Sequence, residues 1–118
     1  MGYSTPATNT YRNKVAQAAA QGGTLPYPEK IAFGTGSAEP SPEDGSLDNE
    51  VLRKDLDSAD AYGTVLHCTG SFSGEDTEEP ITEVGIFDSD GDLMGRRTFA
   101  VKQLEPEASL EYTLDFQF

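Results

Sequence analysis

The sequence predicts an α+β fold in which an N-terminal helix packs on a mainly antiparallel β-sheet or small sandwich, with a long central loop. Three observations predict it. Residues 9–21 are rich in alanine, the second half of the chain alternates apolar and polar residues between turn sequences, and residues 37–46 are rich in Pro, Ser and acidic residues. With 118 residues, the chain has the length of one domain. We expect a flexible lead-in over residues 1–8 and a single domain over residues 9–118.

The first element is a helix over residues 9–21, NTYRNKVAQAAAQ. One of residues 8–10, each Thr or Asn, can cap its start, and Gly22-Gly23 provides a left-handed exit. Alanines favour the helix, and helical spacing gives it one narrow apolar face. Because that face is small, the helix can lie close to a sheet or to a neighbouring subunit. Its candidate contact residues are Tyr11, Val15, Ala18 and Ala19.

The middle of the chain is less regular. Residues 30–33 form a short predicted strand, and Gly34-Thr35-Gly36 after it is interpreted as a turn with positive-φ glycines. The sequence lacks the third glycine of a dinucleotide fingerprint and the Lys-Ser/Thr of a phosphate loop. Residues 47–56 contain Leu47, Val51, Leu52 and Leu56, a spacing that permits either a short helix or an irregular segment packed by its leucines.

The second half is predicted to be β structure. We expect strands at 62–72, 81–87, 93–101 and 109–118, with an acidic loop at 73–80 and a D-G hairpin turn at 88–92. The last strand alternates cleanly, and its apolar face needs a covering sheet. An aromatic residue at position 118 suggests docking, within the subunit or across a subunit boundary. Its apolar residues are Leu110, Tyr112, Leu114, Phe116 and Phe118.

Charge gives the strongest compositional signal. There are 21 acidic and 8 basic residues, for a net charge of −13. Such a surface repels phosphate backbones and anionic lipids, so we expect neither nucleic-acid nor membrane binding. Concentrated salt relieves the self-repulsion, which fits a halophilic source, and an acidic mesophilic protein is the alternative. No apolar run approaches a membrane span and no secretory signal is recognisable, and a single cysteine excludes an intrachain disulfide framework or a cysteine-based zinc site.

The candidate reactive groups have simple structural explanations. His67 and Cys68 are adjacent on a predicted strand, so they point to opposite faces and do not form a nucleophile pair. The run Asp88, Asp90, Asp92 lacks the glycine and glutamate positions of an EF-hand, and we interpret it as a hairpin turn, with a surface cation as the alternative. Acidic pairs among Glu78, Glu79 and Glu83 arise by chance in so acidic a chain. We expect no catalytic residue, metal or cofactor.

Buried arginines are a further possibility. Arg96 and Arg97 are neighbours on a strand, so at most one points inward, where Glu83 on the paired strand is a candidate partner. The alternative is that both are surface charges. The candidate structural polar residues are Arg53, Glu83 and Arg97.

Residues 81–94, ITEVGIFDSDGDLM, carry a resemblance. They resemble the signature of the N-terminal baseplate-attachment domain of phage tail-collar fibre proteins, whose core is hydrophobic-x-EVG-[LI]-FD-x-D-G-x-L. Further segments match in the order of that family: the alanine-rich N-terminal helix, residues 31–36 (IAFGTG), residues 47–53 (LDNEVLR), and the arginine pair 96–97 followed by Phe99. The resemblance covers residues 9–101, most of the chain.

The resemblance implies a non-enzymatic structural protein of a virus tail, made in the host cytoplasm and carried in the virion. The family attaches fibres to baseplates, its fibres are commonly trimeric, and its members continue into a long shaft. Because this chain stops at residue 118, we expect a small adaptor in several copies, as a trimer or around a ring, whose partners are tail, baseplate and fibre proteins. The alternative is a small acidic β-rich carbohydrate- or ligand-binding module, with Tyr3, Tyr27 and Tyr62 as its loop aromatics.

Overall fold

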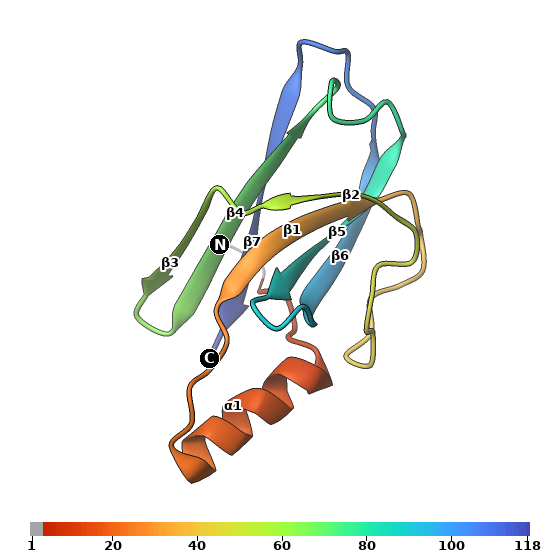
Figure 1. Cartoon of the computed structure of the whole chain (residues 1–118). Coiled ribbons are helices and arrows are strands. Elements are labelled where there is room, and N and C mark those ends of the chain that lie inside the picture. The colour runs from red at the N-terminus through yellow and green to blue at the C-terminus, as the bar shows by residue number, and fades with distance from the viewer. Residues whose placement is uncertain (1–3) are drawn as a thin grey trace.

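The computed structural model describes residues 4–118 and contains one helix and two antiparallel sheets (Figure 1). One sheet has four strands in the order β2-β1-β5-β6, and the other has three in the order β3-β4-β7. None of the described helices is long and apolar enough to cross a membrane. The elements are α1 (Asn9–Gln21), β1 (Pro28–Gly34), β2 (Glu50–Asp55), β3 (Ser58–Tyr62), β4 (Val65–Ser73), β5 (Ile81–Asp88), β6 (Leu93–Lys102) and β7 (Ser109–Gln117).

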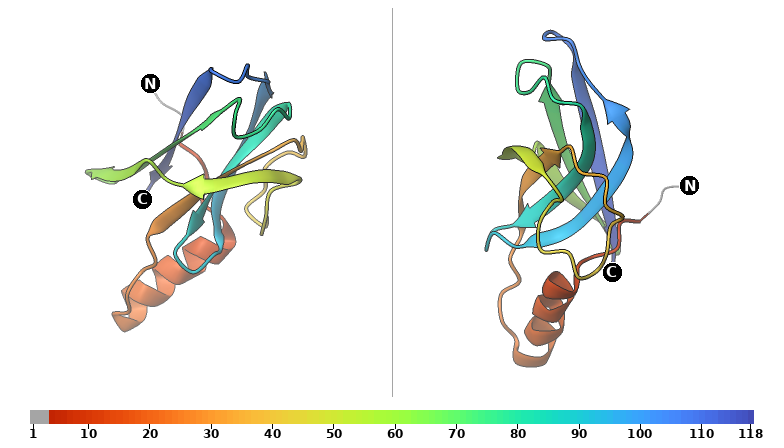
Figure 2. Two further views of the ribbon diagram at one scale, coloured as in Figure 1. Left: turned by 45° about the horizontal axis from the view of Figure 1, so that its top comes forward. Right: turned by 90° about the vertical axis from the view of Figure 1, so that its right-hand side faces the viewer.

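Helix α1 begins and ends where the sequence predicts. The Thr8 hydroxyl accepts a hydrogen bond from the Tyr11 amide at 3.2 Å and so caps the first turn. Gly22 ends the helix with a left-handed φ of 73°, which only glycine adopts without strain. The N-terminal turns hold Tyr11 in the core, while the C-terminal turns extend beyond the sheets (Figures 1 and 2).

Residues 50–55 are a strand, so the prediction of a short helix or an irregular segment over 47–56 is wrong. β2 pairs antiparallel with β1, from Lys30 opposite Asp55 to Gly34 opposite Glu50. Leu52 and Leu56 both pack on the core, and a spacing of four residues places side chains on one face of either a helix or a strand. Residues 50–55 are a strand and not a helix because they pair with β1. The prediction of one strand over 62–72 misses β3 and the turn after it, because the five residues of β3 are all exposed and include no large aliphatic side chain.

The chain crosses from one sheet to the other after β2, after β4 and after β6, and residues 4–8 also bridge the two sheets. After β2, the Leu56 amide donates to the carbonyl of Glu29 in β1 at 3.1 Å, and the Asp57 amide donates to the carbonyl of Thr69 in β4 of the other sheet at 2.8 Å. On the opposite side, the Thr5 amide donates to the carbonyl of Asp115 in β7 at 2.6 Å, and the Thr8 amide donates to the carbonyl of Met94 in β6 at 2.8 Å.

Residues 4–8, part of the lead-in predicted over residues 1–8, lie against both sheets. Residues 4–8 are tied to the sheet edges by backbone hydrogen bonds and by a bridge from Ser4 to Asp115. Residues 1–3, which include the candidate aromatic Tyr3, lie outside the described residues.

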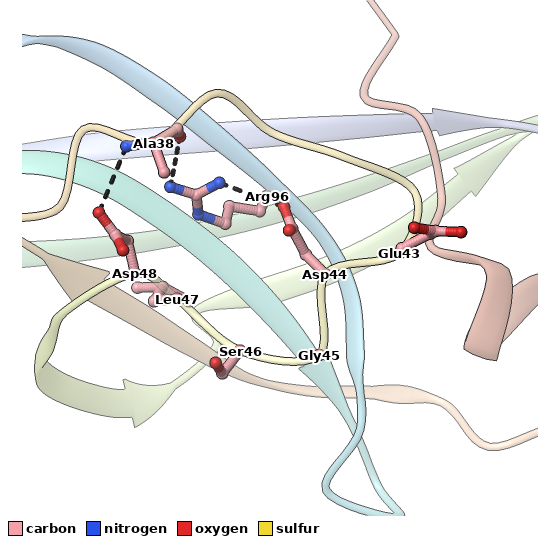
Figure 3. Close-up of a pocket in the computed structure, with 8 residues that line it drawn as sticks. All are labelled: Ala38, Glu43, Asp44, Gly45, Ser46, Leu47, Asp48 and Arg96. Carbon is pink, nitrogen blue, oxygen red and sulfur yellow. Dashed lines mark hydrogen bonds and ion pairs between the residues drawn. The ribbon is translucent and has the colours of Figure 1, made fainter.

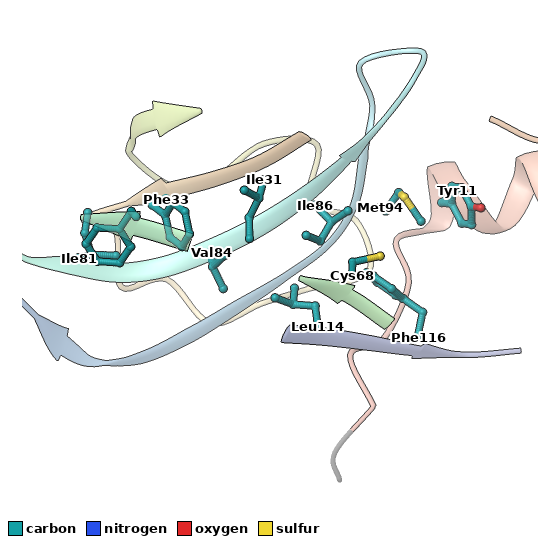
Figure 4. Close-up of a cluster of buried hydrophobic side chains, with 11 residues drawn as sticks. Tyr11, Ile31, Phe33, Cys68, Ile81, Val84, Ile86, Met94, Leu114 and Phe116 are labelled. Atoms are coloured by element: carbon teal, nitrogen blue, oxygen red, sulfur yellow. The ribbon is translucent and has the colours of Figure 1, made fainter. Parts of the chain in front are cut away.

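The main hydrophobic core lies between the facing sides of the two sheets (Figure 4). Phe33 of β1 and Phe72 of β4 meet across it with ring centroids 4.7 Å apart, and Phe99 of β6 stacks on Tyr112 of β7 at 4.5 Å. Such aromatic pairs stabilise the core by more than the burial of each ring's apolar area alone. The buried members are Tyr11, Ile31, Phe33, Cys68, Phe72, Ile81, Val84, Ile86, Met94, Leu114 and Phe116.

Candidate functional site

A buried carboxylate, that of Glu83, lies on β5 within the segment 81–94. Glu83 has no exposed surface, and each of its oxygens accepts two hydrogen bonds. Oε1 accepts from the Asp48 amide at 2.8 Å and from Arg96 Nε at 2.8 Å. Oε2 accepts from the amides of Gly36 at 2.8 Å and Asn49 at 2.7 Å. A carboxylate with all its lone pairs engaged holds structure together and is a poor base for a substrate.

Arg96 completes this cluster from the neighbouring strand β6. Its side chain is 2% exposed, and besides Glu83 it donates from Nη2 to the Ala38 carbonyl at 2.6 Å and from Nη1 to Asp44 Oδ2 at 3.2 Å (Figure 3). The planar guanidinium therefore bonds in three directions. We name Gly36, Asp48, Asn49, Glu83 and Arg96 the Glu83 cluster.

The arginine that meets Glu83 is Arg96, which corrects the choice of Arg97 as a structural polar residue. Arg97 is exposed on β6. Residues 93–96 are all buried, so the alternation that would distinguish the two arginines is interrupted there. The pairing of one inward arginine with Glu83 is confirmed.

The glycines of the segment 34–36 allow the backbone to approach Glu83. A β-carbon at Gly36 would lie 2.5 Å from Glu83 Oε2 and would collide with the Asp48 side chain, and one at Gly34 would lie 2.5 Å from the same oxygen. The prediction that these glycines adopt positive φ is wrong, because the positive-φ glycines of the described chain are Gly22, Gly63 and Gly91. Glycine is required here because the backbone passes close to the Glu83 carboxylate, and not because the chain turns with a positive φ.

Two opposing effects set the charge state of Glu83. Burial by itself raises the pKa of the carboxyl, because it disfavours the ionised form. The Asn49 amide, the Arg96 guanidinium and the Asp48 and Gly36 amides stabilise the ionised form and outweigh burial. The pKa of Glu83 therefore lies below its ordinary value, and the cluster is an ion pair at neutral pH.

The Glu83 cluster fixes the segment between β1 and β2, which folds around a hollow of about 320 Å³ (Figure 3). The hollow is lined mainly by polar groups, including Glu43, Asp44, Asp48 and the edge of Arg96. Residues 37–46 of this segment include two prolines and three acidic residues, of which Glu39 and Glu43 are exposed and Asp44 is partly buried beside Arg96. The cluster thus presents an acidic loop in one fixed shape.

A second charged cluster lies at the β5–β6 turn. Lys14 Nζ of α1 lies 2.7 Å from Asp88 Oδ2, 3.2 Å from Asp90 Oδ2 and 2.7 Å from Asp92 Oδ2. These carboxylates are close enough together to hold a metal ion, but the ammonium group lies among them. Burial lowers the pKa of Lys14, and hydrogen bonds to the three carboxylates raise it by more, so that it lies above its ordinary value. We name these four residues the Lys14 cluster. The Asp88–Asp92 run forms the predicted hairpin turn.

The candidate interface residues divide into buried and exposed groups. Tyr11, Leu114 and Phe116 belong to the protein's own core, which corrects their choice as contact residues, because the other sheet covers them. Ala19 is exposed, and Phe118 is 52% exposed with its ring 6.1 Å from that of Tyr11. The remaining members, Val15, Ala18 and Tyr112, are partly buried.

Arg53 is a surface residue with two partners. It makes a double hydrogen bond to Glu50, at 2.8 and 2.7 Å, and its guanidinium lies 3.8 Å from the centre of the Phe87 ring. The Glu50 pair lies within β2, and the contact with Phe87 connects β2 to β5 of the same sheet, as expected for a structural arginine.

His67 and Cys68 point to opposite faces of β4, as predicted. Cys68 is buried in the core, and burial, with a smaller contribution from Asp115, raises the pKa of its thiol to about 12. His67 is on the outer face, with Nδ1 2.5 Å from Asp115 Oδ1. A thiol with so high a pKa is a poor nucleophile at neutral pH.

Sequence reasoning missed the partners that the loop contributes to the Glu83 cluster. Three of them are backbone amides, which every residue except proline carries, and a fourth is the Ala38 carbonyl. The one available signal was the Gly-x-Gly spacing at 34–36 after a strand. No protein-family model matches the chain, and no curated protein matches it either.

Proposed function

We propose that this protein is a non-enzymatic structural subunit of a virus tail, an adaptor at the baseplate or fibre attachment site that connects tail components to fibres. Its two sheets form a small sandwich, and the long loop between β1 and β2 is its presented surface. The partners are other tail and baseplate proteins and the fibre protein, with several copies in each virion.

One observation carries the proposal. The segments that resemble the tail-collar fibre family are far apart in sequence, yet each supplies a member of the Glu83 cluster. Gly36 comes from the 31–36 segment, Asn49 from the 47–53 segment, Glu83 from the 81–94 segment and Arg96 from the arginine pair. The four segments were matched to the family separately, yet their residues meet around one carboxylate. This convergence supports the proposal that the chain shares its architecture with that family.

The cluster also suits a docking role. A loop that is already ordered loses little conformational entropy when a partner binds it. The Glu83 cluster orders residues 36–49 with three hydrogen bonds from backbone amides of this loop to one carboxylate. The exposed acidic residues of that loop would then meet basic groups on the partner.

The charge supports a halophilic host for the virus. Ion pairs engage five of the eight basic residues of the chain, so the 13 excess negative charges face solvent with little compensation. At about 1 M salt the screening length falls to roughly 3 Å, and the repulsion between copies of the chain largely disappears. Assembly in several copies is therefore easiest in concentrated salt.

The test is deletion of the gene from the virus genome, followed by complementation. We expect particles without the protein to lack attached fibres or a complete tail end in electron micrographs. Wild-type protein and Glu111→Gln, an exposed change on β7, should restore them, and antibody against the chain should label the tail. Particles that never contain the protein, or complete tails in its absence, would contradict the proposal.

A further inference from the structure

The two sheets have four edge strands, and three of them are protected against the addition of a further strand. An edge strand exposes backbone N–H and C=O groups that can pair with another chain, unless charges, bulges or a covering segment prevent it. Four of the six residues of β2 are charged, and its ladder with β1 has a register shift. β6 carries Arg97 and Lys102 at exposed positions. β6 and β7 also accept backbone hydrogen bonds from the Thr8 and Thr5 amides.

β3 is the edge strand that lacks this protection (Figure 1). Its five residues, SADAY, are all exposed and include no proline and no basic residue. Its ladder with β4 is regular over all five pairs, without a bulge. Among residues 4–118 no strand pairs with its outer side. The outer side of β3 is therefore a regular edge on which another strand can be added.

The hydrogen bonds of β4 show which backbone groups of β3 are free. The Phe118 amide donates to the Thr64 carbonyl at 2.8 Å, so the next residue, Val65, directs its N–H and C=O away from β7 and toward β3. This direction alternates along each strand, and the register of β3 and β4 is regular. The second and fourth residues of β3, Ala59 and Ala61, therefore point their N–H and C=O groups outward.

Charge on the outer face of this sheet indicates which strand fits. Asp60 of β3 is opposite His67 of β4, and His67 is opposite Asp115 of β7. His67 is paired with Asp115, so Asp60 stands at the edge without an ion-pair partner among the described residues. An added strand places one of its residues directly beside Asp60. Opposite charges across neighbouring strands stabilise the pair and like charges destabilise it, so a basic residue fits this position.

A second copy of the chain is a poor occupant of this edge. Symmetric antiparallel pairing along the whole of β3 would place the two Asp60 carboxylates opposite each other. Each chain also carries a net charge of −13, which repels a second copy and attracts a basic segment.

We propose that the free edge of β3 binds an extended segment of a partner protein with a basic residue at its centre, which adds a fourth strand to the sheet β3-β4-β7. The backbone groups of Ala59 and Ala61 pair with the segment, and Asp60 pairs with its basic side chain. The small side chains of the two alanines leave room for apolar residues on either side of the basic one. The inference does not depend on the proposed tail function, because it concerns a different part of the molecule from the Glu83 cluster.

The experiment is a titration of the full chain with the peptide acetyl-Thr-Val-Lys-Val-Thr-amide, followed by amide NMR shifts. The peptide sequence reads the same in both directions, so it tests parallel and antiparallel pairing together, and its valines and threonines favour an extended conformation. The matched peptide has Glu in place of Lys. We expect saturable shifts at Ala59 and Ala61, and binding of the Lys peptide about tenfold tighter than that of the Glu peptide.

Variants separate the backbone contribution from the charge. Ala61→Pro removes an outward N–H without breaking the ladder with β4, so it should abolish binding of both peptides, whereas Ala61→Thr keeps the N–H and should keep binding. Asp60→Lys should reverse the preference, so that the Glu peptide binds about tenfold tighter than the Lys peptide. Glu111→Lys is an equal change of charge at an exposed residue of β7 and should leave the wild-type preference intact.

Three results would overturn the proposal. The first is the absence of saturable shifts on β3 with the Lys peptide. The second is an unchanged peptide preference in Asp60→Lys, a change of one exposed side chain that keeps the test decisive if Ala61→Pro does not fold. The third is a set of shifts on β3 that depends on protein concentration without peptide, which would identify a second copy of the chain as the occupant.

Discussion

The β5–β6 hairpin carries a charged cluster near each end, and the two differ in burial and in the groups that surround the charges. In the Glu83 cluster the acidic and basic side chains are 0% and 2% exposed, and backbone amides complete the coordination of the carboxylate. In the Lys14 cluster Asp88 is buried, with 0% of its side chain exposed, but Lys14 is 19% exposed and Asp90 and Asp92 are 60% and 50% exposed. The first depends on fixed protein groups, while the second shares its charges with solvent and salt.

This difference teaches what each cluster contributes. Charges taken out of water are costly, and they persist only when every donor and acceptor is matched, so a buried cluster fixes one arrangement of the chain. An exposed cluster costs little and stabilises little. The loop over residues 36–49 is accordingly held in a single shape, whereas α1 is held to the hairpin turn mainly by Tyr11 and its cap, with Lys14 as a supplement.

The largest expected effect comes from Glu83→Gln. The substitution leaves Arg96 buried without a counter-charge and turns an amide donor toward backbone N–H groups. We expect the free energy of unfolding to fall by about 3–5 kcal/mol, as for other broken buried pairs. Denaturant unfolding in molar salt measures it, with Glu111→Gln as the exposed control. A loss of less than about 1 kcal/mol would show that the buried pair is energetically no different from a surface pair.

The same carboxylate can be neutralised by acid. The pKa of Glu83 lies below its ordinary value of 4.5 in the folded protein. As the pH falls, this carboxylate is therefore protonated at a higher pH in the unfolded chain than in the folded protein. The stability from this group is complete above that ordinary value and is lost as the pH falls through the lower folded value. We expect wild type to lose stability below pH 4.5 more steeply than Glu83→Gln. Parallel acid titration curves for the two proteins would contradict this assignment.

Gly36→Ala tests the close approach of the loop to Glu83. A methyl group there would meet Glu83 Oε2 at 2.5 Å, and the loop must move away from the carboxylate. Overpacking of this kind costs about 1–3 kcal/mol. Gly45→Ala is the control in the same loop, since a β-carbon at Gly45 meets nothing within 4 Å. Thermal unfolding distinguishes them, and equal effects at the two positions would show that the loop does not rest on Glu83.

The helix and most strands were predictable because their signals are local. The cap at Thr8, the alanine run and Gly22 delimit α1, and strict alternation delimits β7. The single helix and the antiparallel strands were therefore predictable. β2 was not, because its leucines fit two periodicities and only pairing with β1 distinguishes them.

The candidate site was predictable only in part. The pairing of Glu83 with an arginine followed from opposite charges on adjacent strands. The identity of the arginine did not, because the burial of all four residues 93–96 removes the alternation, and the register shifts next to this stretch. Four of the loop partners were invisible because they are backbone groups, and Asp44 contributes the one side-chain partner.

The smallest expected effect is at the Lys14 cluster. Lys14→Met keeps most of the apolar stem and removes the ammonium group, which leaves Asp88, Asp90 and Asp92 without a counter-charge. At low salt we expect a loss of about 1 kcal/mol in the free energy of unfolding. The loss should shrink in molar salt, because solvent reaches two of the three carboxylates and salt screens their repulsion. Glu83→Gln should keep its full effect under the same change, since its partners are protein groups without access to ions. Denaturant unfolding at two salt concentrations makes the comparison, and a loss at Lys14 that does not depend on salt would remove the distinction between the two clusters.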